Sequence, residues 1–418
     1  MTRSNVRQGG GGELPNASDE TCNGKPVRMC VIVTVDITLL NLCRGRFEYL
    51  SSRGFEITVI CAPTQHAAEL ERRGVHVFTA PLHRAITPLC DLRAIWRVYR
   101  FLRRERFDIV EVSTPKGALI GSIAASLARV PSVVHLLRGL VYEGQRGARR
   151  RLLKLSQALP CMLAGEVISV SHSLAEQAVA DGLCPRSKIR VLGQGSSNGV
   201  DVTRFAPVDS SERLGVRESF GIPASAVVAG FVGRMTKDKG IVELIGAFTD
   251  VAARETNLYL LLVGDYETRD RPGSDVVEAI AGHVRIRHVG WQEDTARFYK
   301  VMDFLVLPTY REGFPTVLLE AAATALPTVS TDVVGCRDAV VAEETGLVVP
   351  AGDTKALASA IDRMATDKPL RERLGAAGRQ RVETFFDQRT VWSLQEAALR
   401  RLLSQSRVDG LKTGTPTK

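Results

Sequence analysis

The sequence predicts an α/β protein with two doubly wound parallel-sheet domains that face each other across a cleft. Short apolar segments rich in β-branched residues alternate with longer segments of helical periodicity, which is typical of parallel sheets covered by helices on both faces. The alternation stops at a polar stretch, 201–223, and then restarts, which predicts a second domain. The chain has 418 residues, of which 44% are hydrophobic and 24% charged. These values suit two globular domains and exclude a disordered, collagen-like or coiled-coil chain.

The first half contains segments that we predict to be buried strands with helices between them. In the helical segment 92–102 the apolar residues, Leu92 and Trp96 among them, recur at helical spacing, so we expect them on its buried face. The predicted strands are Met29–Val35, Glu56–Cys61, Val75–Thr79, Ile109–Val112, Ser132–Leu136 and Glu166–Val170.

The second half repeats the alternation and ends in long helical segments. Its predicted strands are Val227–Val232, Leu258–Val263, Val284–His288, Phe304–Leu307 and Thr328–Ser330. Its predicted helices are Ile241–Ala252, Asp294–Met302, Thr316–Ala325, Lys355–Thr366, Leu370–Phe385 and Gln388–Leu403.

These patterns divide the chain into an N-terminal domain, 27–205, and a C-terminal domain, 206–403, whose last helix we expect to pack back on the first domain. The flanking segments 1–26 and 404–418 are polar, and we expect them to be disordered. The N-terminal segment lacks the apolar core of a signal peptide, and no stretch of about 20 apolar residues predicts a membrane span. The cysteines form no CxxC pair, which argues against a zinc ribbon and fits a reducing cytosol.

The strongest chemical pattern is the segment 310–320, which reads YREGFPTVLLE. A strand ends just before it and a helix begins near Thr316, so the first helix amides lack internal partners and favour an anion. Glu312 and Glu320 flank this position, and carboxylates beside an anion are best explained by sugar hydroxyls on both sides. The alternative is a capped helix with a solvated glutamate.

A second pattern, GRMTKDKG at 233–240, also lies between a predicted strand and a helix. Gly233 allows a close approach of a ligand, Arg234 can bind phosphate oxygens through two nitrogens, and Lys239 adds a point charge. The segment is neither a Walker loop nor GxGxxG. The alternative is a basic turn that faces solvent.

Together these motifs resemble the retaining family-4 glycosyltransferases of the GT-B fold, over about 27–403. Further matches are LLVGDYE at 261–267, HVGW at 288–291 and NGVD at 198–201. The resemblance implies a nucleotide-sugar donor, with UDP as the expected nucleotide. It implies that Arg234 and Lys239 hold the diphosphate, Glu320 the ribose and Glu312 the donor sugar. It further implies a sugar–phosphate site lined by the amides of Gly313, Phe314, Thr316 and Val317, and a base beside Gly290 and Trp291.

The N-terminal half departs from the family pattern. The first loop, 35–41, has no glycine pair, and Arg138 stands where many relatives have a histidine before glycine. We therefore expect Arg138 in the catalytic and acceptor site, and His135 as a core residue. Lys116, in STPKG before a helix, is a candidate acceptor phosphate ligand or a surface lysine. The pairing of STPKG with LLRGLVYEG resembles a subgroup that acts on polyprenyl-diphosphate-linked sugars in capsule, exopolysaccharide or O-antigen synthesis.

The net charge of +9 is concentrated in the first half, in two basic runs. We expect them to contact an anionic membrane surface, which predicts a cytoplasmic protein peripheral to the inner face of the plasma membrane; the alternative is a solvated face. No nucleic-acid recognition motif is present, so nucleic acid is not an expected partner. The runs are Arg93, Arg97, Arg100 and Arg104, and Arg146, Arg149, Arg150, Arg151 and Lys154.

No Asp-x-Asp metal motif occurs, so we expect no metal or cofactor, and fixed cations in its place. Three other functions remain as alternatives. A nucleotide-sugar epimerase of the same fold would need no acceptor, and a membrane-peripheral nucleotide-sugar-binding subunit would not turn over the donor. A dehydrogenase is disfavoured because GxGxxG is absent after the first strand.

Overall fold

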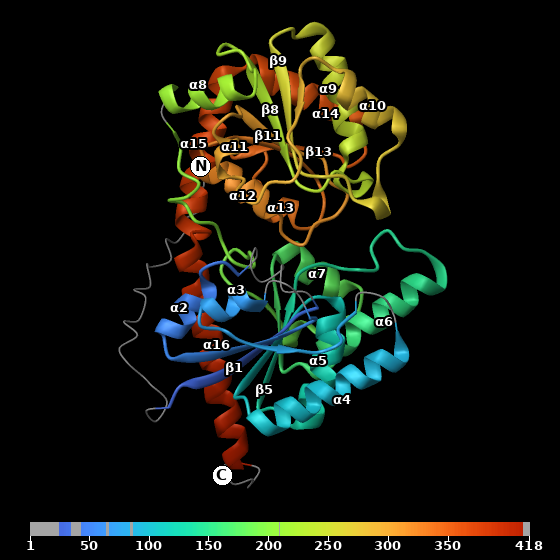
Figure 1. Ribbon diagram of the computed structural model, residues 1–418, viewed down its shortest axis with the longest axis vertical. Helices are drawn as coiled ribbons and strands as arrows, with labels where there is room; N and C mark the ends of the chain where they lie inside the picture. The colour runs from blue at the N-terminus through green and yellow to red at the C-terminus, as the bar shows by residue number, and fades with distance from the viewer. Residues whose placement is uncertain (1–24, 35–42, 64–66, 84–86, 209, 413–418) are drawn as a thin grey trace, which may run out of the picture.

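The computed structural model describes residues 25–34, 43–63, 67–83, 87–208 and 210–412. Two α/β domains are stacked along the long axis of the molecule, and one long C-terminal helix runs from the second domain down the first (Figure 1). The predicted fold class is confirmed: each domain is a parallel sheet covered by helices. The predicted disordered segment 1–26 and the loop 35–41 lie almost wholly outside the described residues.

The N-terminal sheet has seven parallel strands in the order β3-β2-β1-β4-β5-β6-β7. Its first strand shows why the apolar segments form it: Met29 and Val31 point into one core, whereas Cys30 and Ile32 point into the core on the other face. The strands are β1 (Val27–Ile32), β2 (Phe55–Cys61), β3 (His76–Thr79), β4 (Ile109–Val112), β5 (Ser132–Leu137), β6 (Glu166–Ser169) and β7 (Ile189–Val191). The helices are α2 (Arg46–Ser52), α3 (Ala67–Arg72), α4 (Pro88–Glu105), α5 (Pro115–Ala128), α6 (Gly147–Leu163) and α7 (His172–Ala180).

The C-terminal sheet has six parallel strands in the order β10-β9-β8-β11-β12-β13. Its strands are β8 (Val227–Val232), β9 (Leu258–Val263), β10 (Ile286–His288), β11 (Phe304–Leu307), β12 (Thr328–Thr331) and β13 (Gly346–Val349). Its helices are α8 (Ser210–Ser219), α9 (Ile241–Arg254), α10 (Ser274–Gly282), α11 (Ala296–Tyr299), α12 (Thr316–Ala323), α13 (Cys336–Ala339), α14 (Thr354–Thr366) and α15 (Lys368–Phe385).

The chain crosses between the domains twice, and the two crossings are hydrogen-bonded to each other. The Val200 amide donates to the Phe386 carbonyl at 2.8 Å, and the Gln388 amide donates to the Val200 carbonyl at 3.0 Å. Helix α16 (Gln388–Lys412) then packs on the N-terminal domain, where Leu399 and Leu402 join the core of that domain. The last helix therefore ties the two domains together.

The structure corrects three details of the sequence analysis. Leu92 and Trp96 of α4 are exposed, and the small residues Ala94 and Val98 face the core instead. The edge strands β7 and β13 were not predicted. The expected disordered tail begins too early, because α16 continues to Lys412; within it, the hydroxyl of Ser406 bonds that of Ser132 at 2.5 Å.

None of the described helices is both long enough and apolar enough to cross a bilayer. The cysteines among the described residues form no disulfide.

Candidate active site

A cavity of about 360 Å³ lies where the carboxyl ends of the two sheets face each other. In parallel α/β folds this is the edge at which ligands bind. We call it the interdomain cavity. Its C-terminal wall contains three residues singled out in the sequence, Arg234, Lys239 and Glu312, and its N-terminal wall contains His135 and Arg138. The structure thus brings together the two chemical patterns that the sequence separates by more than seventy positions.

The domains touch at this point through backbone. A side chain added at Gly313 would place its Cβ 1.8 Å from the carbonyl oxygen of Arg138, so only glycine fits. The Ser171 hydroxyl donates to the Gly313 carbonyl at 2.8 Å. Beside this contact, Asp338 accepts hydrogen bonds from the amides of His172 and Ser173 at the start of α7. The cavity is therefore closed on one side by a direct contact between the domains.

Helix α12 begins at Thr316, with Pro315 at its N-cap. Among the described residues, the amides of Thr316 and Val317 donate no hydrogen bond, whereas that of Leu318 returns to the Pro315 carbonyl at 3.1 Å. Both free amides lie at the positive end of the helix dipole, which favours an anion. The Phe314 side chain turns away from this site and packs against both domain cores, with its ring 5.5 Å from that of Phe386.

The two predicted phosphate-binding cations are both paired with carboxylates. The Lys239 ammonium group contacts the Glu312 carboxylate, and each side chain is only 16% exposed. Arg234 contacts Glu267, but its side chain is 61% exposed, so this pair contributes little to stability. Lys239 and Glu312 are therefore held in place at the cavity wall, and Arg234 is free to turn toward a ligand.

Glu320 lies one turn inside α12 and is held by a residue from α11. The buried Tyr299 hydroxyl donates to Glu320 Oε2 at 2.6 Å. Burial raises the pKa of Glu320, and Tyr299 partly offsets this effect. The second carboxylate oxygen accepts no hydrogen bond from the described residues, so the side chain is oriented and can still accept one from a hydroxyl.

The N-terminal wall carries a buried charge cluster. Arg46 binds Glu111 through two nitrogens, at 2.8 and 2.5 Å, and both side chains are almost wholly buried. Although burial alone would raise the pKa of Glu111, Arg46 lowers it, and Arg138 adds to this effect. Among the described residues, the Arg138 side chain donates a hydrogen bond only to the Cys43 sulfur, at 3.7 Å, and its buried Nε and Nη1 have no partner there. A guanidinium group with unsatisfied donors in a cavity wall is suited to bind an anion or an acceptor oxygen.

His135 lines the same wall in a neutral state. Its Nδ1 donates to the Val112 carbonyl at 3.3 Å, and its Nε2 is buried without a partner. Burial lowers the pKa of His135 to about 4. His135 is buried, as expected of a core residue, but its Nε2 accepts no hydrogen bond from the described residues and faces the cavity as an acceptor.

Several predicted site residues lie elsewhere. Lys116 does not line the interdomain cavity; it is largely buried and pairs with Asp91 of α4 at 2.7 Å. Its candidate role as an acceptor phosphate ligand is therefore not supported. Trp291 is 60% exposed, and Gly290 precedes it with a positive φ of 68°, which is the backbone conformation that favours glycine. At Gly233 the φ is 151°.

Other residues at the site had no assigned role in the sequence analysis. Tyr299 had no local signal, because only the fold places it against Glu320. Gln157 of α6 clamps the loop after β5, accepting from the Val141 amide at 3.1 Å and donating to the Gly139 carbonyl at 2.6 Å. Asp238 and Arg311 lay inside the quoted motifs, and their 2.6 Å ion pair joins those motifs.

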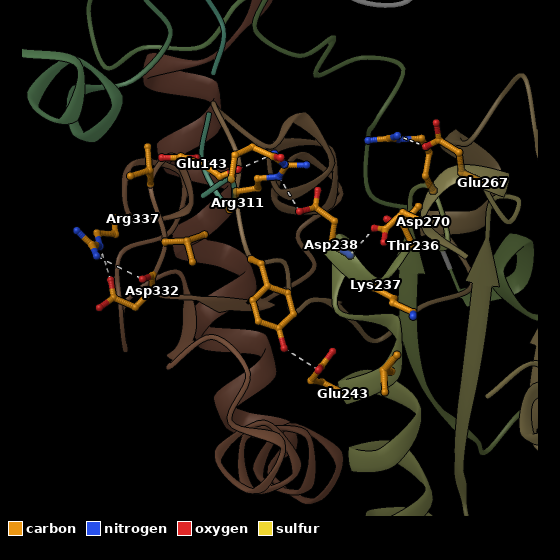
Figure 2. A pocket seen from close by; sticks show the side chains of 17 residues that line it. Glu143, Thr236, Lys237, Asp238, Glu243, Glu267, Asp270, Arg311, Asp332 and Arg337 are labelled. Atoms are coloured by element: carbon orange, nitrogen blue, oxygen red, sulfur yellow. Dashed lines mark hydrogen bonds and ion pairs between the residues drawn. The ribbon is translucent and has the colours of Figure 1, made fainter. Parts of the chain in front are cut away.

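A second, larger cavity of about 1010 Å³ adjoins the first (Figure 2). Glu143, Arg234, Asp238 and Arg311 line both. We call it the outer cavity. Among the described residues, no group of three or more histidine, cysteine or carboxylate side chains has the arrangement of a metal site.

Two Rossmann-like domains that face each other across a cleft define the fold class of the GT-B glycosyltransferases. A family model described as "Glycosyl transferases group 1" matches residues 226–367, and one described as "Glycosyl transferase 4-like domain" matches residues 43–195. The chain belongs to this family and is a glycosyltransferase.

Relatives and solved structures agree with this assignment. The chain is 33% identical to the "Capsular polysaccharide biosynthesis glycosyltransferase CapM" of Staphylococcus aureus, over 90% of this chain and 97% of the relative. It is 28% identical to the "UDP-Gal:alpha-D-GlcNAc-diphosphoundecaprenol alpha-1,3-galactosyltransferase" of Escherichia coli, over 78% and 84% of the two chains. The fold matches that of Anabaena HepE, solved in complex with UDP and glucose, with a TM-score of 0.75 and 20% identity over 90% of this chain and 100% of the other.

The neutral state of His135 predicts a pH dependence of folding stability. Its pKa rises from about 4 in the folded protein to the ordinary 6.5 on unfolding, so the unfolded chain binds more protons between these values. The contribution of neutral His135 to the free energy of unfolding is therefore complete above pH 6.5. It decreases by on the order of 3 kcal/mol as the pH falls toward 4. Urea denaturation across this range should show a smaller loss for His135→Asn. An identical pH dependence in the two proteins would contradict the prediction.

Proposed function

We propose that the protein is a retaining glycosyltransferase that moves a hexosyl or N-acetylhexosaminyl group from a UDP-sugar to a glycan acceptor on a polyprenyl diphosphate. One observation carries the proposal. Arg234, Lys239, Glu312 and Gly313 line a single cavity that is closed by the acceptor-side residues Arg138 and His135. This lining supports a donor position in the cleft, with two cations and the Glu312 carboxylate around it.

In the proposed donor complex the diphosphate binds Arg234, Lys239 and the first amides of α12. Its oxygens compete with Glu312 for Lys239, which releases the Glu312 carboxylate to accept hydroxyls of the donor sugar. Glu320, oriented by Tyr299, accepts the ribose hydroxyls. Gly290 and Trp291 adjoin the base. The donor would thus be bound along α12, with its sugar toward the N-terminal domain.

The proposed reaction breaks the bond between the anomeric carbon and the phosphate oxygen, and forms the bond to the acceptor oxygen on the same face of the sugar. The acceptor proton passes to an oxygen of the leaving phosphate, so no protein base is required. Negative charge grows on that phosphate, where the fixed cations and helix amides stabilise it. We therefore propose that no metal ion or cofactor is needed.

The acceptor assignment rests on relatives whose names give it. One acts on an acceptor with GlcNAc on diphosphoundecaprenol, another is named for capsular polysaccharide biosynthesis, and a third, from Campylobacter jejuni, is 26% identical and is named for a diphospho-undecaprenol acceptor. These names support a role in cell-surface polysaccharide synthesis.

A mixed apolar and basic surface on the N-terminal domain supports binding to a membrane. Helix α5 packs between α4 and α6, and the three lie side by side at the lower right of Figure 1. Leu89, Leu92 and Trp96 of α4 are 84%, 64% and 57% exposed, and Leu155 and Met162 of α6 are 69% and 64% exposed. We call these residues the docking surface.

Arginines share the exposed side of α4 with the apolar residues, rather than lying opposite them. Arg93, Arg97 and Arg100 are exposed, and the Arg100 guanidinium lies 4.7 Å from the Trp96 ring. Exposed apolar side chains among cations suit an anionic lipid surface, where each basic residue contributes about 1 kcal/mol. We propose that the lipid surface is the cytoplasmic face of the membrane, since cysteines without disulfides among the described residues suit a reducing compartment.

Replacing a residue of the donor site should remove turnover without unfolding the protein. Lys239→Ala and Glu320→Ala should each reduce nucleotide release by a factor of about 10² to 10³, since each removes a group that stabilises the bound donor or the leaving diphosphate. The exposed residues Lys355 and Glu278 supply matched controls, Lys355→Ala and Glu278→Ala. Full activity in either site variant, with an unchanged circular dichroism spectrum, would reject the donor site.

Chelation should leave turnover largely intact, because protein cations and amides stabilise the leaving group. The measurement is the rate of nucleotide release with and without EDTA, followed by addition of Mg²⁺. A strict dependence on Mg²⁺ would contradict the metal-independent mechanism.

The docking surface should bind vesicles that contain phosphatidylglycerol more strongly than vesicles of phosphatidylcholine alone. The double variant Leu92→Ser/Trp96→Ser should weaken this binding about tenfold or more, because each side chain gains about 1.5–3 kcal/mol on leaving water. Val284→Ser is a matched control, since Val284 is 79% exposed on the other domain. Equal sedimentation of the double variant and the wild type with the vesicles would rule out this surface.

A further inference from the structure

The outer cavity lies on the opposite side of the β8–α9 loop from the proposed nucleotide site. Helix α9 connects β8 to β9, which lies on one side of it in the sheet, and α12 connects β11 to β12, which lies on the other side. Because both crossovers are right-handed, α9 and α12 cover opposite faces of the sheet. The outer cavity is bounded by the first turn of α9, by Tyr310 and by the segment 332–337. None of the residues expected to hold the base or ribose lines it. Binding of the donor would therefore leave this cavity open to another ligand.

Two buried polar atoms in its wall have no partner. Thr236 is 1% exposed, and its hydroxyl makes no hydrogen bond to the part of the chain that the structure describes. Glu243 is only partly buried as a residue, but its Oε2 atom is buried and also has no partner there. The other Glu243 oxygen accepts from the Tyr310 hydroxyl at 2.6 Å. This bond raises the pKa of Tyr310 to about 12, so the hydroxyl stays protonated and orients the carboxylate. Buried polar atoms that remain unsatisfied at a cavity wall indicate a ligand with polar groups of its own.

The charges of the wall identify the chemistry of that ligand. Three of its four cations are paired with carboxylates: Arg311 pairs with Asp238 at 2.6 Å, and Arg337 and Arg234 contact Asp332 and Glu267. The fourth, Lys237, is exposed and has no ion pair within the described part of the chain. Lined by six carboxylates and four cations, the cavity would repel a second phosphate (Figure 2). Hydroxyl groups can donate to carboxylates and accept from guanidinium groups, so an uncharged polyol fits both. The carboxylates are Glu143, Asp238, Glu243, Glu267, Asp270 and Asp332.

The outer cavity is continuous with the acceptor side of the interdomain cavity. Glu143 and Arg311 line both, and Arg311 donates to the Glu143 carbonyl across the domain boundary at 3.3 Å. The loop 143–145 that forms this wall leads into α6, whose exposed Leu155 and Met162 belong to the docking surface. A glycan in the outer cavity would therefore lie between the transfer site and the surface proposed to contact lipid.

We propose that the outer cavity binds sugar residues of the acceptor beyond the one that receives the new sugar, with Glu243, Tyr310 and Thr236 as hydroxyl ligands. The inference rests on the proposed function. It assigns the enzyme to chain elongation: the acceptor already carries at least two sugars, and an earlier glycosyl transfer must supply it.

The test uses the full chain with lipid-linked saccharides extracted from membranes and separated by glycan length, and measures UDP release. Wild type should show a lower acceptor KM for fractions with two or more sugars than for the one-sugar fraction. Glu243→Gln should raise the KM for the longer fractions about tenfold, because it removes a hydrogen bond to a charged group. The KM for the one-sugar fraction should not change. Calorimetric affinity for UDP should not change.

Tyr310→Phe is a second variant that guards against a folding defect in the first, and Glu278→Gln is the matched control on the exposed side of α10. Equal KM values for short and long fractions in wild type, or an unchanged KM in both variants, would overturn the inference alone. Weaker UDP binding by Glu243→Gln would also overturn the inference, because it would show that the outer cavity binds the donor. If no fraction supports UDP release by wild type, the proposed function fails and this inference fails with it.

Discussion

The site depends on the direct contact between the domains at Gly313 and Arg138. No side chain fits between Gly313 and the Arg138 carbonyl, and Ser171 holds the Gly313 carbonyl from the other domain. This contact fixes the start of α12 against the loop after β5. It thereby sets the distance between the cations of one domain and the acceptor-side residues of the other. The crossing at Val200 and the packing of α16 support the same arrangement from behind.

Around that contact, charge is arranged in advance of any ligand. Lys239 is held by Glu312, Arg311 by Asp238, and Arg46 by Glu111. Each pair holds a long side chain in one position, so less conformational entropy is lost when a substrate binds. Arg138 differs, because two of its nitrogens have no partner and are buried. The two walls of the cleft therefore have distinct chemistry: paired cations beside a helix terminus on the donor side, and an unsatisfied guanidinium group with a neutral histidine on the acceptor side.

Much of the fold follows from the sequence, because short continuous apolar segments such as Val227–Val232 are typical of strands buried on both faces. Edge strands are harder to predict: Ile189–Val191 is three residues long and only partly buried, so its apolar signal is weak. Periodicity in α4 gave the buried face only in part: Leu102 is buried and Ile95 and Tyr99 pack against the core, whereas Leu92 and Trp96 are exposed. Ala94 and Val98 occupy the centre of the buried face, which the spacing of large apolar residues does not reveal. The extension of α16 beyond Leu403 depends on tertiary contacts such as Ser406 with Ser132, which no local pattern contains.

The motifs likewise predicted which residues would converge, but not their partners. Arg234, Lys239 and Glu312 could be identified from the chain alone, whereas Tyr299 and Glu143 reach the site only through the fold. The central claim is that one pyrophosphate lies between the β8–α9 loop and the first amides of α12. A crystal structure of the protein with UDP tests it most directly. The account predicts pyrophosphate oxygens within hydrogen-bond distance of Arg234, Lys239 and the Thr316 amide, with the ribose on Glu320. A pyrophosphate bound beside Tyr310 and Glu243, with the start of α12 left free, would contradict it.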